Sequence, residues 1–178
     1  MFTSLSYLRK AFEQARVAFA GVHLQECFHW GVSSYAYDNC QTLADGLREN
    51  TRVIWVQGAK SPLYKITPDP LDHHRIGTRY EGLLKKERAE GHDVILIGGV
   101  WAKGCVKTFI ERSVQPLGLL PVVVVDAVDL VYVRPGQPFK YTADQLKCIA
   151  AETYGHTNAM FCTTAEILAC RPAGLNPL

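Results

Sequence analysis

The sequence predicts an α/β fold in which a mainly parallel central sheet of about five to six strands lies between two layers of helices. Short apolar runs alternate along the chain with segments whose apolar residues recur at three- and four-residue spacing. This alternation is typical of buried parallel strands connected by amphipathic helices. Because such connections are right-handed, the helices are expected on both faces of the sheet. No repeat, low-complexity segment or linker interrupts the pattern, so we expect residues 1–178 to form one domain.

The first half of the chain supplies two strands and three helices. We expect helices at 4–15, 37–49 and 78–91, and strands at 17–22 and 52–57. Thr78 and Glu81 have the T-x-x-E spacing of a capping box at the start of the third helix. Residues 58–77 contain three prolines and little periodicity, which predicts a long loop, and loops of this length in compact domains are usually functional.

The second half of the chain continues the alternation. We expect strands at 94–97, 121–125 and 159–162, and helices from 106, over 143–154 and from 163 to about 170. Thr142 and Thr163 or Thr164 are suited to cap the last two helices. Residues 130–141 contain two prolines and a glycine and are predicted to form a loop.

Composition excludes several classes of protein. The chain has 48% hydrophobic and 20% charged residues, which argues against disorder. The net charge is +2 and no Lys/Arg run is dense, so no nucleic-acid partner is expected. No apolar run approaches the roughly 20 residues of a membrane span. The N-terminal segment lacks the pattern of a signal peptide. We therefore expect a cytoplasmic protein with no membrane partner.

The six cysteines, at positions 27, 40, 105, 148, 162 and 170, predict free thiols rather than disulfides or a zinc site. No two have C-x-x-C spacing, and none is paired with histidine in the spacing of zinc ligands. We expect no metal or other cofactor. Asp72, His73 and His74 could bind a metal, but a polar surface turn explains them more simply.

The central segment, residues 93–106, carries the strongest chemical signal, with the sequence DVILIGGVWAKGCV. A buried strand passes through Gly98-Gly99 and reaches Cys105 where a helical pattern begins. Unpaired N–H groups at a helix N-terminus favour a thiolate, which is the nucleophilic form of cysteine. Two interpretations remain open: Cys105 is a reactive nucleophile, or it is a small buried apolar residue.

The segment GVWAKGCVKT, residues 99–108, resembles the nucleophile segment of the isochorismatase-like cysteine hydrolases, a family that includes nicotinamidases. The resemblance spans residues 17–170, and Gly77-Thr78 and Asp126-Ala127 support it. It implies a cis peptide bond between Val100 and Trp101. It also implies an oxyanion hole formed by the N–H groups of Trp101 and Cys105, and a homo-oligomer, either a dimer or a tetramer.

The catalytic triad implied by this resemblance is divergent. The family has an aspartate, then a glutamine two residues later and a phenylalanine three after that; this chain has His23, Gln25 and Phe28. His23 therefore stands where the family has its base. Asp69 or Pro70 stands near the position expected for the family lysine, and the nearest lysines are Lys65 and, further away, Lys60. The metal-binding pattern of nicotinamidases is absent after the second strand.

These residues lead to the hypothesis of a hydrolase that acts on a small-molecule amide, imide or ester. In this hypothesis Cys105 attacks the carbonyl, His23 accepts the thiol proton and Lys65 stabilises the thiolate. Gln25, Phe28, Trp30, Val100 and Trp101 are expected to line the substrate site.

The alternative hypothesis is a catalytically inactive relative that binds a ligand or a protein, because a fold can persist after its site is lost. A core histidine is the simpler interpretation of His23 alone. A nucleotide-binding domain is disfavoured, since the G-x-G-x-x-G and Walker A patterns are both absent.

Overall fold

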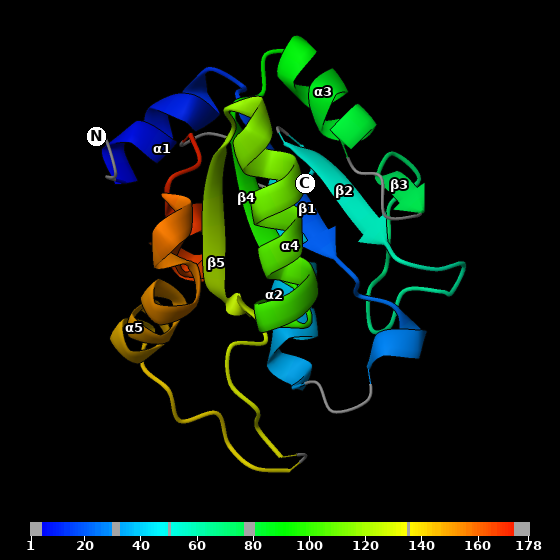
Figure 1. Cartoon of the computed structure of the whole chain (residues 1–178), viewed down its shortest axis with the longest axis vertical. Helices are drawn as coiled ribbons and strands as arrows, with labels where there is room; N and C mark the ends of the chain where they lie inside the picture. The colour runs from blue at the N-terminus through cyan, green and yellow to red at the C-terminus, as the bar shows by residue number, and fades with distance from the viewer. Residues whose placement is uncertain (1–4, 30–32, 50, 77–80, 135, 173–178) are drawn as a thin grey trace.

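A six-stranded parallel sheet forms the centre of the computed structural model, which describes residues 5–29, 33–49, 51–76, 81–134 and 136–172 (Figure 1). The strands are β1 (Val17–Val22), β2 (Arg52–Gln57), β3 (His73–Ile76), β4 (Val94–Gly99), β5 (Leu120–Val128) and β6 (Met160–Cys162). Their order in the sheet is β3-β2-β1-β4-β5-β6, and every neighbouring pair is parallel. The predicted fold class is therefore confirmed.

Helices cover both faces of this sheet (Figure 1). They are α1 (Leu5–Glu13), α2 (Ser34–Leu47), α3 (Glu81–Ala89), α4 (Lys107–Phe109), α5 (Ala143–Tyr154) and α6 (Thr164–Ala169). The short α4 lies between two π-helical segments, Ala102–Val106 and Ile110–Val114, so the helical stretch after β4 is longer than α4 alone. None of the described helices combines the length and hydrophobicity needed to span a bilayer.

Two apolar cores result from the alternation of side chains along the strands. One core packs α1, α2 and α6 against the first face, with residues such as Phe19, Trp55 and Leu96. The other core packs α3, α4 and α5 against the opposite face, with residues such as Ile97 and Val123. All six residues of β1 and of β4 are buried, which is why these strands have continuous apolar sequences.

The loop predicted at 58–77 is partly wrong, because its last residues form the edge strand β3. His73 to Ile76 pair with Ile54 to Gln57 of β2. The sequence HHRI has no apolar alternation, since most of this short strand is exposed. Backbone hydrogen bonds with β2, rather than side-chain burial, therefore define it.

The predicted caps of α5 and α6 are confirmed. The Thr142 hydroxyl accepts a hydrogen bond from the Gln145 N–H, and the Gln145 side chain bonds back to the Thr142 N–H. Thr163 and Glu166 make the same pair of bonds at α6. The Thr78 of the predicted third capping box lies outside the described residues.

Candidate active site

The carboxyl ends of β1 and β4 lie side by side at the centre of the sheet. Val22 is in register with Gly99, and the Val100 N–H donates to the Val22 carbonyl at 3.0 Å. Strand order reverses between these two strands, because β1 continues to β2 and β3 while β4 continues to β5 and β6. Ligands bind at such switch points in open α/β sheets. His23 and Trp101, which follow β1 and β4, are therefore placed at the expected site.

Gly99 allows the close approach of these two strands. Its φ of +133° lies in a region that favours glycine. A Cβ built on Gly99 would lie 2.2 Å from the Val22 carbonyl oxygen, far inside van der Waals contact. Gly99 is therefore required by backbone packing at the end of β4, whereas a Cβ on Gly98 would lie 2.6 Å from the Cys40 Sγ.

Trp101 turns the chain from β4 into the following helical segment. Its backbone is left-handed, with φ 64° and ψ 59°, which is uncommon for a bulky residue. The Trp101 carbonyl then accepts a hydrogen bond from the Gly104 N–H at 2.9 Å. The described residues contain no cis peptide bond, so the predicted cis bond between Val100 and Trp101 is wrong. A left-handed residue makes the turn, which avoids the cost of a cis bond outside proline.

Asp129 is the functional candidate that sequence reasoning missed. It follows β5, and its Oδ1 accepts a hydrogen bond from the Ala102 N–H at 2.9 Å. Burial raises the pKa of Asp129 to about 6, although hydrogen bonds from the Trp101 and Ala102 backbones act in the opposite direction. The available signal was a second acid, three residues after Asp126, at the end of the strand that follows Cys105 in the chain.

Cys105 lies in the first turns of the helical segment and is only partly buried. Burial, and secondly the negative charge of Asp129, raise the pKa of the Cys105 thiol. These two effects oppose the one expected from the helix N-terminus, which favours the thiolate. The Asp129 carboxylate thus acts on the thiol through its charge.

An aromatic cluster forms beside these groups. The His23 ring stacks on Phe28 with a centroid distance of 5.0 Å, and Phe28 meets Trp101 edge-on at 4.9 Å. His23 is buried, which lowers its pKa and favours the neutral imidazole. Trp101 keeps 43% of its surface exposed. The cluster thus gives the site one apolar wall that a solute can reach at Trp101.

Solved structures with this arrangement of strands and helices are known. A cysteine hydrolase from Pseudomonas syringae pv. phaseolicola 1448A aligns with a TM-score of 0.67 and 20% identity, over 88% of this chain and 92% of that protein. An isochorismatase-like hydrolase from Alkaliphilus metalliredigens aligns with a TM-score of 0.68 and 12% identity, over 90% and 99%. A MAR1 ribonuclease from Caenorhabditis elegans aligns with a TM-score of 0.65 and 18% identity, over 90% and 83%.

The chain has the isochorismatase-like fold. No protein-family model and no curated protein matches its sequence. The likeness at these identities concerns the fold, so the chemistry of the site must be judged from its own residues.

Three further residues were predicted to line the substrate site of this isochorismatase-like fold: Gln25, Val100 and Trp30. Gln25 is buried, and its side chain forms two hydrogen bonds with the segment after β2. Its Oε1 accepts from the Gly58 N–H at 2.7 Å, and its Nε2 donates to the Ala59 carbonyl at 2.5 Å. Val100 is buried in the core below the turn. Trp30 lies outside the described residues. Gln25 therefore stabilises the backbone of the segment after β2 through these hydrogen bonds.

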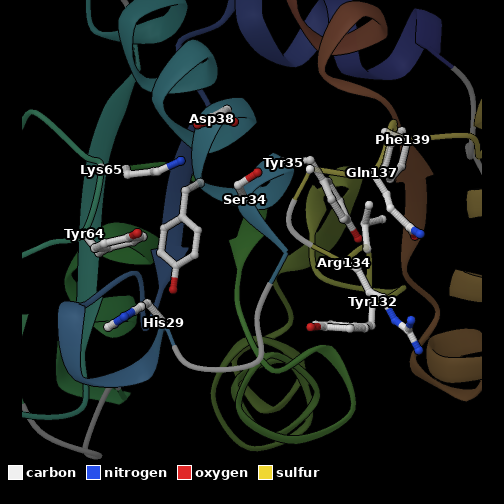
Figure 2. A pocket seen from close by; sticks show the side chains of 13 residues that line it. His29, Ser34, Tyr35, Asp38, Tyr64, Lys65, Tyr132, Arg134, Gln137 and Phe139 are labelled. Carbon is white, nitrogen blue, oxygen red and sulfur yellow. The ribbon is translucent and has the colours of Figure 1, made fainter.

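Lys65 lies on a separate cavity (Figure 2). This cavity, of about 580 Å³, is lined by Lys65 and by aromatic residues near the start of α2, whereas Cys105, His23 and Trp101 are not among its lining residues. Lys65 is also left-handed, with a φ of 53°.

The surroundings of Asp72, His73 and His74 do not favour a metal site. Asp72 is engaged by Trp55 Nε1 at 2.8 Å and by Arg48 Nη2 at 3.0 Å. His73 and His74 are neighbours on β3, and successive strand residues point to opposite faces.

One group of possible metal ligands occurs among the described residues, formed by Glu87, Glu90 and His92. Arg52 Nη1 bonds Glu87 Oε1 at 3.0 Å in this group, and His92 Nδ1 lies 3.1 Å from Glu87 Oε2. Burial alone would raise the pKa of Glu87, but hydrogen bonds from His92 and Arg52 outweigh it and lower this pKa. The arginine charge takes the place of a cation here. The group lies at the amino ends of the strands, opposite the carboxyl end of β4 that leads to Cys105, because Arg52 begins β2 and His92 precedes β4.

Proposed function

We propose that this protein is a hydrolase that uses Cys105 as the nucleophile and Asp129 as the proton acceptor, acting on a small-molecule amide, imide or ester. One observation carries the proposal: the Asp129 carboxylate lies at the turn that leads to Cys105, where its Oδ1 accepts from the Ala102 N–H at 2.9 Å. Burial raises the pKa of Asp129 to about 6, and the charge of this carboxylate contributes to the raised pKa of the Cys105 thiol. A base whose pKa lies near the working pH is well suited to proton transfer. The folds of a cysteine hydrolase and of an isochorismatase-like hydrolase support the reaction class.

The raised pKa of Cys105 determines how the first step proceeds. The thiol is neutral at rest, so its proton must leave as the sulfur attacks the carbonyl carbon. A carbon–sulfur bond forms and the proton moves from Sγ to the Asp129 carboxylate. Collapse of the tetrahedral intermediate then expels the amine or alcohol, which takes the proton from Asp129 and leaves a thioester.

Hydrolysis of the thioester reverses the proton movements. Asp129 accepts a proton from the attacking water, the carbon–sulfur bond breaks, and the thiol regains the proton as the acid product leaves. The Cys105 N–H, in the first turns of the helical segment, is proposed as an oxyanion donor. The Trp101 N–H is a weaker candidate for this role, because it bonds Asp129.

A Cys105–His23 dyad is the second possible source of a base. The lowered pKa of His23 favours the neutral imidazole, whose unprotonated ring nitrogen can accept a proton. The two bases are distinguishable, because replacing the true base lowers turnover far more than replacing the other.

A non-catalytic ligand-binding module is the second candidate function. The observation that favours it is the hydrogen bonding of the Asp129 carboxylate by the Trp101 and Ala102 backbones, where the resemblance implied an oxyanion donor. A site closed in this way would bind without catalysis. The proposed homo-oligomer, a dimer or tetramer, is compatible with both functions and can be measured by sedimentation.

Hydrolysis of a panel of aryl esters, aryl amides and cyclic imides tests the proposal. We expect Cys105→Ser to abolish turnover and Asp129→Asn to lower it by about 100-fold or more. Cys148→Ser, at an exposed thiol in α5, is the matched control and should retain activity. Wild-type turnover should rise with pH through about 6 as Asp129 ionises.

Alkylation of Cys105 by iodoacetamide separates the two functions. Asp129→Asn should speed alkylation at neutral pH, because it removes the charge that raises the thiol pKa. Faster alkylation without hydrolysis of any panel compound by the wild type would favour the binding module. Unchanged alkylation would contradict the placement of Asp129 beside Cys105.

A further inference from the structure

The cavity that contains Lys65 lies at the N-terminus of α2 (Figure 2). Cys105, His23 and Asp129 are not among the residues that line it. Its volume is about 580 Å³, which lies within the range of small-molecule sites and is larger than the volume of a single benzene ring. His29, Tyr64 and Lys65 lie on one side in Figure 2, and Tyr35, Tyr132 and Phe139 lie on the other.

Aromatic pairs form the two sides of this cavity. His29 stacks on Tyr64 at 4.6 Å with an interplanar angle of 20°. Tyr35 packs against Phe139 at 4.5 Å on the opposite side. The Tyr64 segment is held by the hydrogen bond from its N–H to the Leu24 carbonyl at 2.9 Å. The Tyr37 ring, which also lines the cavity, meets Tyr64 edge-on at 5.2 Å. Aromatic side chains around a cavity of this size suit a flat ring.

The Tyr37 hydroxyl is the observation that points most directly to a ligand. Tyr37 lines the cavity and is only 1% exposed, yet no described residue bonds its hydroxyl. A buried hydroxyl without a partner is costly, and buried tyrosine hydroxyls usually find one. A hydrogen-bonding group on a ligand in this cavity would satisfy it.

The charges around the cavity favour an anion. Lys65 and Arg134 line it, and neither forms an ion pair with a described residue, whereas Asp38 is the one carboxylate among the lining residues. The start of α2 adds to this preference. Its N-cap Ser33 donates its hydroxyl to the Val131 carbonyl and accepts from the Val133 N–H, so its side chain does not cap the first turn.

We propose that this cavity is a binding site for a planar aromatic ring system that carries one acidic group, a carboxylate or a phosphate. The rings stack between the Tyr64 and Tyr35 sides, the Tyr37 hydroxyl bonds a polar atom of the ligand, and Lys65 with the N-terminus of α2 attracts the acid. The site is independent of catalysis by Cys105, since no residue of the proposed chemistry lines it.

Isothermal titration of the full chain with two acids and their neutral counterparts tests this proposal. AMP and 2-naphthoate are the acids, and adenosine and 2-naphthamide are the matched neutral compounds. We expect at least one acid to bind with a Kd below about 1 mM, and about fivefold more tightly than its neutral counterpart. Preference for AMP indicates a phosphate ligand, and preference for 2-naphthoate indicates a carboxylate. The advantage of the acid should shrink at high salt.

Variants identify the cavity as the place of binding. Tyr37→Phe should weaken binding about three- to tenfold through loss of one hydrogen bond, whereas Tyr7→Phe in α1 should not. Lys65→Met should weaken binding of the acid only, with Lys60→Met in the same loop as the control. Asp38→Asn should strengthen binding of the acid, because it removes the opposing charge.

Three results would overturn the proposal. These are binding of both acids weaker than about 10 mM, equal affinity for acid and neutral compounds, or no effect of both Tyr37→Phe and Lys65→Met. Lys65 is exposed, so its variant stays informative even if Tyr37→Phe fails to fold. Cys105→Ser should bind like the wild type, and a catalytically silent protein that still binds the acid would separate this site from the proposed hydrolysis.

Discussion

Replacing Asp129 by asparagine should stabilise the protein at neutral and alkaline pH. The raised pKa means that the fold disfavours the charged carboxylate relative to the unfolded chain. The rise from the ordinary value of 3.8 to about 6 corresponds to about 3 kcal/mol. Partial exposure of the side chain makes this an upper limit, so we expect a gain of about 1–3 kcal/mol in the free energy of unfolding at pH 8.

The pH dependence of this gain has a definite sign. Between about pH 4 and 6 the folded protein keeps the Asp129 proton while the unfolded chain has lost it. The wild type therefore loses stability from this residue as pH rises through that window, and the full cost is present above it. Asparagine does not ionise, and its Oδ1 can still accept from the Ala102 N–H. The difference between variant and wild type should thus be small near pH 4 and largest near pH 8.

Urea unfolding, followed by tryptophan fluorescence at several pH values between 4 and 8, measures this difference. Comparing each variant with the wild type removes the contribution of carboxylates whose pKa is lowered by folding. Glu152→Gln, at an exposed position in α5, is the control and should show little pH-dependent difference. A gain that does not grow between pH 4 and pH 8 would refute the assignment of a buried, proton-accepting Asp129.

Two further substitutions test the frame around the site. Gly99→Ala should lower the free energy of unfolding by about 3 kcal/mol or more, because φ is +133° and the new Cβ would meet the Val22 carbonyl oxygen. A loss below about 1 kcal/mol in urea unfolding would contradict this. Gly82→Ala is the control, because the space around Gly82 is open. Asp72→Asn should cost about 1–3 kcal/mol at pH 7, since it weakens a nearly buried pair with Arg48. Burial alone would raise the pKa of Asp72, but hydrogen bonds, chiefly from Arg48, outweigh it and lower this pKa. The stabilisation from the ion pair is therefore lost as pH falls through the pKa of Asp72 in the folded protein. If Asp72→Asn cost the same free energy of unfolding at pH 3 and at pH 7, the ion pair would be contradicted.

Local pattern was sufficient for most elements of the fold. The strands at 17–22 and 52–57 were predicted with the bounds that the structure shows, because continuous apolar runs encode burial on both faces. Thr142 and Thr163 marked helix starts through side-chain chemistry that is local in sequence. The strand β3 was missed because its exposed side chains have no alternation and only its pairing with β2 makes it a strand.

The sequence by itself determined the fold class and the position of Cys105 after a glycine-rich turn at the end of a central strand. Those features depend on residues close together in the chain. Only the tertiary structure decided which groups gather around the turn that leads to Cys105. It brings the Asp129 carboxylate to this turn, at the Ala102 N–H, because β5 is the neighbour of β4, and it places Lys65 on a different cavity. Strand order and register join residues that are distant in sequence, so no local periodicity could reveal that a carboxylate after one strand bonds the turn that follows another.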